Sequence, residues 1–221
     1  MKSQKELLLG SVLALVLLAG CGAQSAAPAS SASGASSASA TTQAAADTSA
    51  QKSGASSSAG TFAVTIAYDY TRADTAASNQ IAAWVEDKDG KLVKNLGATR
   101  FTATGGFARR KESLPLWVSK AHPEQWKSSD VDAVAQATPQ PGHQTITWDG
   151  TDEKGAPVPD GTYTVWLEGT LYWTSDYRAH ATVTVPTQQD AELDVTEEFT
   201  EDTAQNRDMI TNVKMMLHGK S

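Results

Sequence analysis

The chain has 221 residues, with 25 acidic and 18 basic side chains, a formal net charge of −7 and a single cysteine. One cysteine excludes an internal disulfide and a cysteine-based zinc site. The negative charge argues against a nucleic-acid partner, because phosphate binding needs a positive surface. The length corresponds to one domain, or at most two.

Residues 1–20 have the composition of an export signal. Lys2 and Lys5 precede an apolar run at residues 7–18. As a helix this run would span only about 18 Å, whereas the hydrocarbon core of a bilayer is about 30 Å thick. We therefore expect a signal peptide that is removed, rather than a permanent transmembrane helix.

The apolar run ends in Leu18-Ala19-Gly20-Cys21, which resembles the lipobox of bacterial lipoproteins. The resemblance implies that Cys21 carries a diacylglyceryl group and acyl chains such as palmitate, and becomes the new N-terminus. Several acyl chains on one residue give stable membrane attachment. The resemblance thus implies an exported, lipid-anchored protein that faces the periplasm or the cell exterior. The alternative is a plain secretory signal that happens to end beside a cysteine.

A long segment of small residues follows the cysteine. Residues 22–59 contain 14 Ala and 12 Ser, and no Val, Ile, Leu, Met, Phe, Trp or Tyr. Such a composition cannot offset the entropy lost on ordering the backbone, so we predict a disordered linker over residues 21–59, with the lipidated cysteine at its start. As a flexible coil its root-mean-square reach is roughly 30–35 Å.

Residues 60–221 have the composition of a folded domain, and the prevailing pattern is that of β-strands. Residues 61–68 alternate polar and apolar side chains, which places Phe62, Val64 and Ile66 on one face. Asp89-Gly90 is typical of a tight turn between two strands. The same signals predict strands at 61–68, 80–87, 92–96, 143–150, 162–169 and 181–185, and a final one at 209–217.

Two stretches lack this alternation. Residues 101–139 are expected to be irregular except for a short helix over residues 129–137, with Ser129 as its N-cap. The acidic residues 190–202 are expected to form a solvated loop. Seven or so short strands with turns between them predict an all-β fold, an antiparallel immunoglobulin-like β-sandwich with one short helix.

Two resemblances rest on particular segments. The hairpin at Trp148–Tyr163 resembles the Ig-like module of flagellar hook-capping proteins. It is preceded by Ala83–Asp87, Leu114–Val118 and Asp132–Pro139 in the order seen in the predicted periplasmic family called domain of unknown function 2271. The chain resembles that family over roughly residues 61–217. This resemblance implies an extracytoplasmic sandwich that accompanies membrane redox proteins and flavin-handling enzymes.

One segment is similar to a modification motif. Covalently flavinylated bacterial proteins carry Asp-x-x-Ser/Thr-Gly-Ala-Thr, whose last Thr takes FMN as a phosphoester. Asp132 and Thr138 stand at this spacing, but Ala135 and Gln136 replace the Ser/Thr and the Gly. The similarity implies FMN as a cofactor on Thr138. The alternative is an ordinary helix end with no cofactor.

Catalytic signatures are missing from the sequence. It contains no Gly-x-Ser-x-Gly and no His-Glu-x-x-His pattern. The four histidines are scattered without metal-ligand spacing. We therefore expect no catalytic residue, no metal site and no enzymatic activity.

Two groups of side chains are candidates for partner contact. Arg109, Arg110 and Lys111 form the densest positive run, suited to anionic lipid headgroups, a cell-wall polymer or an acidic partner, or simply to a solvated loop. Trp166 and Trp173 are candidates for a stacking platform for glycans or a protein partner, unless they belong to the core. Tyr172 and Tyr177 are the other proposed members of this platform.

These observations predict a lipid-anchored extracytoplasmic binding or accessory module without catalysis of its own. Its partners would be the membrane, through the lipid anchor, and an envelope protein. The alternative is a component of a membrane-associated redox system, either a flavin carrier or a docking partner of a membrane flavoprotein. The two hypotheses differ in whether the protein carries a flavin.

Overall fold

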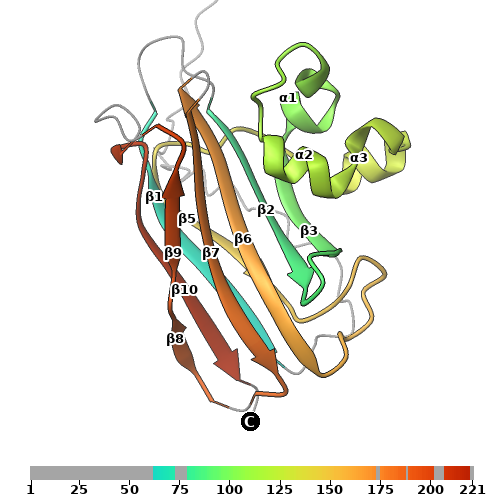
Figure 1. The fold of residues 1–221 in the computed structure, drawn as a ribbon, viewed down its shortest axis with the longest axis vertical. Coiled ribbons are helices and arrows are strands. Elements are labelled where there is room, and N and C mark those ends of the chain that lie inside the picture. Colours follow the sequence, from blue (N-terminus) through green and yellow to red (C-terminus); the bar gives the residue numbers. More distant parts are fainter. Residues whose placement is uncertain (1–61, 73–78, 173–174, 188, 202–206, 220–221) are drawn as a thin grey trace, which may run out of the picture. The chain divides into compact units, whose positions relative to one another are not determined.

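Two β-sheets packed face to face form the framework of the structure, a computed structural model that describes residues 62–72, 79–172, 175–187, 189–201 and 207–219. Its strands are β1 (Phe62–Tyr70), β2 (Gln80–Asp87), β3 (Leu92–Thr99), β4 (Ala135–Gln136), β5 (Gly142–Trp148), β6 (Gly161–Tyr172), β7 (Ser175–Val185), β8 (Ala191–Leu193), β9 (Thr196–Phe199) and β10 (Ile210–Gly219). The smaller sheet has the order β5-β1-β10-β8, and the larger has β4-β3-β2-β6-β7-β9 (Figure 1). The predicted β-sandwich is confirmed.

The main core lies between the two sheets and follows from the alternation in the strands. In β1 every second residue is buried, including Phe62, Val64 and Ile66, as predicted. The inward residues of β6 are Tyr163, Val165 and Leu167, which pack in the same core. All strand pairs within the sheets are antiparallel except β3–β4, which is parallel.

The prediction that residues 190–202 form a loop is wrong for part of that stretch, because it contains β8 and β9. The stretch is mostly acidic and polar, but its apolar residues Leu193, Val195 and Phe199 pack against the main core. The ring of Phe199 lies 4.9 Å from that of Tyr177, whose hydroxyl donates to Glu197 at 2.9 Å. Packing against β7 therefore overrides the low strand propensity of this acidic sequence.

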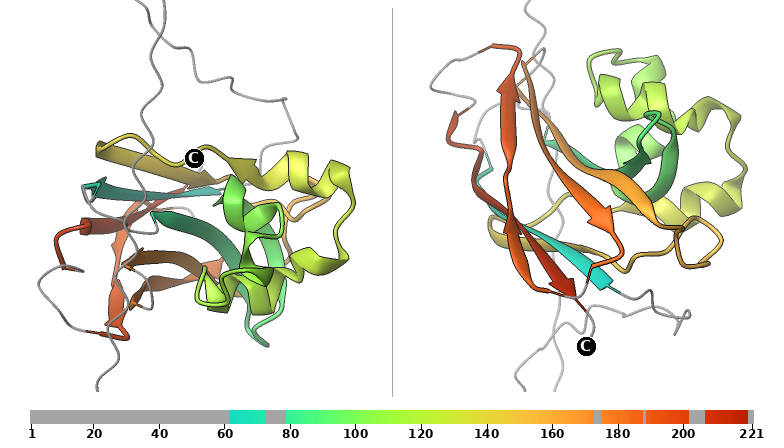
Figure 2. Two further views of the ribbon diagram at one scale, coloured as in Figure 1. Left: turned by 90° about the horizontal axis from the view of Figure 1, so that it is seen from above. Right: turned by 60° about the horizontal axis from the view of Figure 1, so that its bottom comes forward.

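Residues 100–134 form a layer of short helices, which we call the helical layer. It contains α1 (Arg100–Ala103), the 3₁₀ turn η1 (Gly106–Ala108), α2 (Pro115–Ala121), the 3₁₀ turn η2 (Pro123–Gln125) and α3 (Ser128–Val134). Figures 1 and 2 show these helices gathered on the outer side of the larger sheet, beside β2 and β3. The sequence predicted a single helix in this region.

The predicted helix exists, with different ends. Helix α3 begins at Ser128, and Lys127 occupies the N-cap, where its backbone N–H donates to the carboxylate of Asp130 at 2.9 Å. It ends at Val134 because the next two residues, Ala135 and Gln136, pair with β3 as strand β4. Ser129, the predicted N-cap, lies inside the helix.

A second, smaller core joins the helical layer to the sheet. It consists of Ala82, Trp84, Ala98, Ala103, Leu114, Trp117, Ala121 and Val134. Buried hydroxyls and an amide accompany it. The Gln80 side-chain oxygen accepts from Thr99 at 2.6 Å and from Thr102 at 2.9 Å, and Thr102 lies 2.6 Å from the hydroxyl of Ser113. Each of these buried polar groups therefore has a partner, as a stable interior requires.

Thr170 of β6 completes this polar junction, and its replacement tests how the layer is held. Its hydroxyl accepts from the backbone N–H of Leu114 at 2.9 Å and donates to the carbonyl of Glu112 at 3.0 Å. Thr170→Val keeps the shape but leaves both groups unpaired, so we expect a loss of about 1–3 kcal/mol in the free energy of unfolding, measured in urea. Thr164→Val, on the same face of β6, should stay within about 0.5 kcal/mol of the parent protein. Equal effects of the two substitutions would contradict this account.

Candidate functional site

A groove of about 390 Å³ lies between the helical layer and the loop of residues 149–157, which is part of the connection from β5 to β6. The strand β3 contributes residues to its lining. The lining residues are Leu92, Asn95, Ala121, Trp126, Asp130, Ala133, Val134 and Glu153. A volume of this size falls in the range of small-ligand pockets.

Asn95 of β3 ties the two sides of the groove together. Its side-chain oxygen accepts from the indole Nε1 of Trp117 in α2 at 2.8 Å. Its backbone and side-chain N–H groups donate to Oε1 of Glu153 in the loop, at 2.7 and 2.8 Å. The backbone N–H of Glu153 in turn donates to the carbonyl of Val93 at 3.1 Å. These bonds fix the width of the groove.

The lining combines apolar surface with carboxylates. Leu92 and Trp126 are half-buried, and Val134 is buried. The indole of Trp126 is held edge-on against Trp117, with ring centroids 5.5 Å apart. The carboxylates of Asp130 and Glu153 are both on exposed residues. The groove is therefore suited to a ligand or peptide that carries apolar groups and a positive charge.

Trp126 also borders a second hollow, of about 310 Å³, within the helical layer itself. Its lining residues are Ala103, Thr104, Gly105, Phe107, Pro123, Glu124, Trp126, Ser128, Val131 and Asp132. The exposed acids Glu124 and Asp132 again accompany aromatic surface. Residues of the helical layer thus line both of these hollows.

Helix α2, which carries Trp117, is fixed at both ends by glutamates of the sheet. At its first turn Glu168 of β6 accepts from the backbone N–H of Leu116 at 2.9 Å and of Trp117 at 2.7 Å. Near its last turn Lys120 donates to Glu86 of β2 at 3.1 Å. Glu168 satisfies two of the N–H groups that every helix start leaves unpaired. No local pattern distinguishes Glu168 in the sequence, because its neighbours have the alternation of an ordinary strand.

Glu168 belongs to a buried charged cluster on the outer face of β6 and β7. Arg178 lies opposite it, with Nη2 at 2.6 Å from Asp176 and Nε at 3.6 Å from Glu168. Burial raises the pKa of Glu168 to about 8, and the negative charge of Asp176 adds to the rise. Burial also raises the pKa of Asp176, an effect that Arg178 partly offsets. The cluster therefore holds a proton near neutral pH.

The aromatic platform predicted around Trp166 and Trp173 is not assembled as expected. Trp166 lies on the outer face of β6 between two rings, with centroids 5.7 Å from Trp84 and 4.3 Å from His180. Both faces of its ring are thus occupied, and a sugar cannot stack on it. Tyr177 points into the main core, where it is buried, because it alternates with the outward residues of β7. Trp173 lies outside the described residues, and Tyr172 is half-buried.

The basic run Arg109–Lys111 connects η1 to α2 at one end of the helical layer. Arg109 and Lys111 are exposed, whereas Arg110 is half-buried. The structure therefore separates the run into two outward cations and one that packs against the protein. Cys21, the predicted lipidation site, lies outside the described residues.

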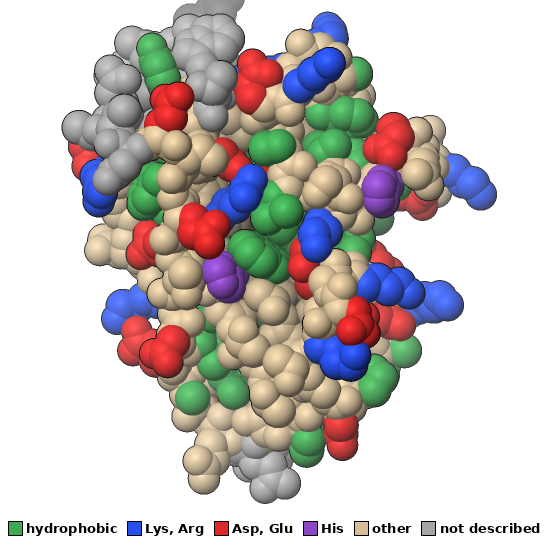
Figure 3. Space-filling model, viewed as in Figure 1, with side chains coloured by type: hydrophobic (Ala, Val, Ile, Leu, Met, Phe, Trp, Pro, Cys, Tyr) green, Lys and Arg blue, Asp and Glu red, His purple; other side chains and the backbone are tan. Residues whose placement is uncertain are grey.

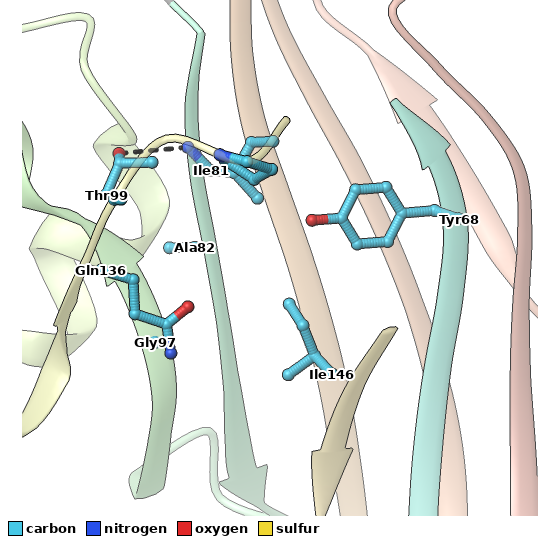
Figure 4. Close-up of a pocket in the computed structure, with 9 residues that line it drawn as sticks. Tyr68, Ile81, Ala82, Gly97, Thr99, Gln136 and Ile146 are labelled. Atoms are coloured by element: carbon cyan, nitrogen blue, oxygen red, sulfur yellow. Dashed lines mark hydrogen bonds between the residues drawn. The ribbon is translucent and has the colours of Figure 1, made fainter. Parts of the chain in front are cut away.

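Thr138, the predicted flavin attachment site, is half-buried just after β4. Its neighbours Ala137 and Pro139 line a cavity of about 20 Å³ between the sheets, which has room for one water molecule. Figure 4 shows Tyr68 pointing toward this cavity, with Gln136 near its edge. Gln136, at the motif's Gly position, packs over Gly97, where a Cβ would lie 2.3 Å from its amide nitrogen. A flavin on Thr138 would therefore have to lie on the surface.

Two further features of the described part of the chain concern metal ligation and membrane spanning. In those residues no group of three or more His, Cys, Asp or Glu side chains is placed to hold a metal ion. Among the same residues, none of the helices combines the length and apolar character needed to cross a bilayer.

The raised pKa of Glu168 predicts how stability depends on pH. The unfolded chain loses this proton near pH 4.5 and the folded protein near pH 8. The folded state therefore binds more protons between these values, and the free energy of unfolding should fall as pH rises through that window. Glu168→Gln removes the titration, so the variant should lose less stability than the parent protein between pH 5 and pH 8. Urea midpoints at several pH values measure this.

Glu198 is an exposed acid opposite Arg178, so Glu198→Gln should leave the pH dependence of stability unchanged. If Glu168→Gln had the same pH dependence of stability as the parent protein, Glu168 would not be the titrating group.

The comparisons with known proteins identify a family. A model of predicted periplasmic proteins, domain of unknown function 2271, matches residues 61–201. No curated protein and no solved structure matches the chain. The matched span includes the helical layer and the groove, and its description supports an exported location. With nearly two thirds of its length matched, this chain belongs to the family of predicted periplasmic proteins with domain of unknown function 2271.

Proposed function

We propose that the protein is a lipid-anchored extracytoplasmic binding module without catalysis of its own. In this proposal the groove between the helical layer and the loop of residues 149–157 is its recognition site. The observation that carries the proposal is the groove of about 390 Å³ in which apolar side chains lie beside the carboxylates of Asp130 and Glu153. The partner is a segment of an envelope protein with apolar side chains and at least one Lys or Arg.

The rigidity of the groove supports binding. Asn95 bonds to both of its sides, and Glu168 and Lys120 hold the two ends of helix α2. A site that is already formed loses little conformational entropy when a partner enters. Charge supports the same choice of partner, because the positive potential of a Lys or Arg complements the acidic rim and steers the encounter.

The anchor supports a module that works at the membrane surface. The segment Leu18–Cys21 resembles the lipobox, and the family is described as one of predicted periplasmic proteins, which supports an exported location. Lipid on Cys21 would concentrate the domain near membrane partners, since tethering raises the effective concentration of the second binding event. Weak contacts in the groove would then suffice for specific recognition.

Site-specific photo-crosslinking in intact cells tests the groove. We expect a photoreactive residue in place of Ala133, which lines the groove and is exposed, to give a discrete adduct with one envelope protein. The captured segment, located by mass spectrometry, should contain Lys or Arg beside apolar residues.

The matched control carries the same photoreactive residue at Thr147, an exposed position on β5 of the other sheet. It should give no such adduct. An adduct common to both positions, or a captured segment that is acidic, would refute the groove as the recognition site.

The alternative function is a flavin-carrying or flavoprotein-docking component of a membrane redox system. The spacing of Asp132 and Thr138 favours it, and the packing of Gln136 over Gly97 opposes it. The binding module predicts a colourless protein, purified from its own membranes, whose extra mass is lipid on Cys21 alone. A visible flavin band, with an added mass that disappears in Thr138→Ala, would refute the binding module and support the redox carrier.

A further inference from the structure

The end of the helical layer around α1 and η1 carries an exposed aromatic ring and three exposed cations. We call Arg100, Phe101, Arg109 and Lys111 the basic tip. Phe101 is 39% exposed and is the only large hydrophobic residue counted as exposed in the described part of the chain. All three cations are exposed, and none has an ion pair within the described residues.

The backbone around Gly106 holds these side chains together. The ring of Phe101 lies against Gly106 so closely that a Cβ there would be 2.5 Å from two ring carbons and 2.3 Å from the Phe101 carbonyl oxygen. The carbonyl of Gly106 accepts from the backbone N–H of Arg109 at 3.0 Å. The ring and the Arg109 backbone are therefore placed by the same tight turn.

Figure 3 shows the same clustering on the surface. Lys and Arg side chains lie at the end of the molecule that α1 and η1 form, with hydrophobic side chains beside them, and further Lys and Arg side chains follow along the same side. This positive end belongs to a chain with a net charge of −7. Exposed cations at one end of an acidic protein give that end a positive local potential, which attracts anionic surfaces.

We propose that the basic tip docks on the surface of an anionic phospholipid bilayer, with Phe101 entering the headgroup region and Arg100, Arg109 and Lys111 contacting phosphates. An exposed aromatic ring among cations matches the membrane interface, where apolar rings and Lys or Arg both find favourable surroundings. A soluble polyanion offers contacts for the cations but none for the ring. The proposal goes beyond the proposed function and does not require lipid on Cys21.

The docking would add a second membrane contact to the lipid anchor. Lipid on Cys21 would attach the chain to the membrane at a position 41 residues before Phe62. Contact through the basic tip would select the orientations that turn the α1–η1 end toward the lipid. A second membrane contact would reinforce the attachment that the lipid provides, because separate membrane signals in one chain add to one another.

Vesicle binding by a chain that starts at residue 22 tests the proposal without the lipid anchor. The main core is formed entirely by residues between Phe62 and Leu217, so this chain keeps it. We expect binding to vesicles that contain phosphatidylglycerol, no binding to pure phosphatidylcholine vesicles, and weaker binding at high salt. Replacing Arg100, Arg109 and Lys111 together by Gln should weaken binding about fivefold per cation, or roughly a hundredfold.

A matched triple variant separates the tip from the overall charge. Lys91→Gln, Lys127→Gln and Lys154→Gln remove three exposed cations elsewhere, so the net charge is the same. The vesicle affinity of this variant should fall by less than about fivefold relative to the parent. Phe101→Ser should weaken binding without changing its salt dependence, and all variants should keep the urea midpoint of the parent.

Equal losses in the two triple variants, or equal binding to neutral and anionic vesicles, would overturn the proposal. Because vesicles contain no protein partner, failure here leaves the groove adduct from Ala133 unaffected. Conversely, loss of that adduct would not alter vesicle binding. The two proposals can therefore fail separately.

Discussion

The side chain of a buried glutamate in the larger sheet holds the helical layer in place. Glu168 accepts two backbone N–H groups at the first turn of α2, and Thr170, two residues further along β6, bonds the segment just before that helix. The α-helices of the layer have only four or seven residues, too few to be stable alone. Their arrangement is therefore imposed by the strand beneath, and one wall of the groove depends on it.

Much of the sandwich could be predicted because its strands follow a simple rule. The inner face of each sheet is buried, so β1 and the first half of β6 alternate clearly. The predicted bounds of β2 agree with the structure. The strands β8 and β9 were not predicted, because their few apolar residues are spread among acidic ones. In both cases the determining factor is what a strand packs against, which the local sequence reveals only when the alternation is strong.

The helical layer and the groove could not be predicted in the same way. Glu168 sits in an ordinary strand pattern, and only the fold shows that it is buried against backbone N–H groups. Asn95, Trp126 and Glu153 come from three distant segments, and no local signal connects them. The aromatic candidates could not be assigned from the sequence for the same reason. Trp166 and Tyr177 lie on opposite faces of the larger sheet, and the rings that pack against Trp166, those of Trp84 and His180, come from other strands.

The position of β10 has a consequence for how this exported chain acquires its structure. Ile210–Gly219 lies between β1 and β8 in the smaller sheet, and β1 belongs to the opposite end of the described chain. Until this strand is available, β1 has only β5 as a neighbour, and one side of the main core stays uncovered. Closure of the sandwich must therefore wait for a contact between its first and last strands. A chain with this topology cannot complete its main core strand by strand, and it folds as a unit once β10 has joined β1.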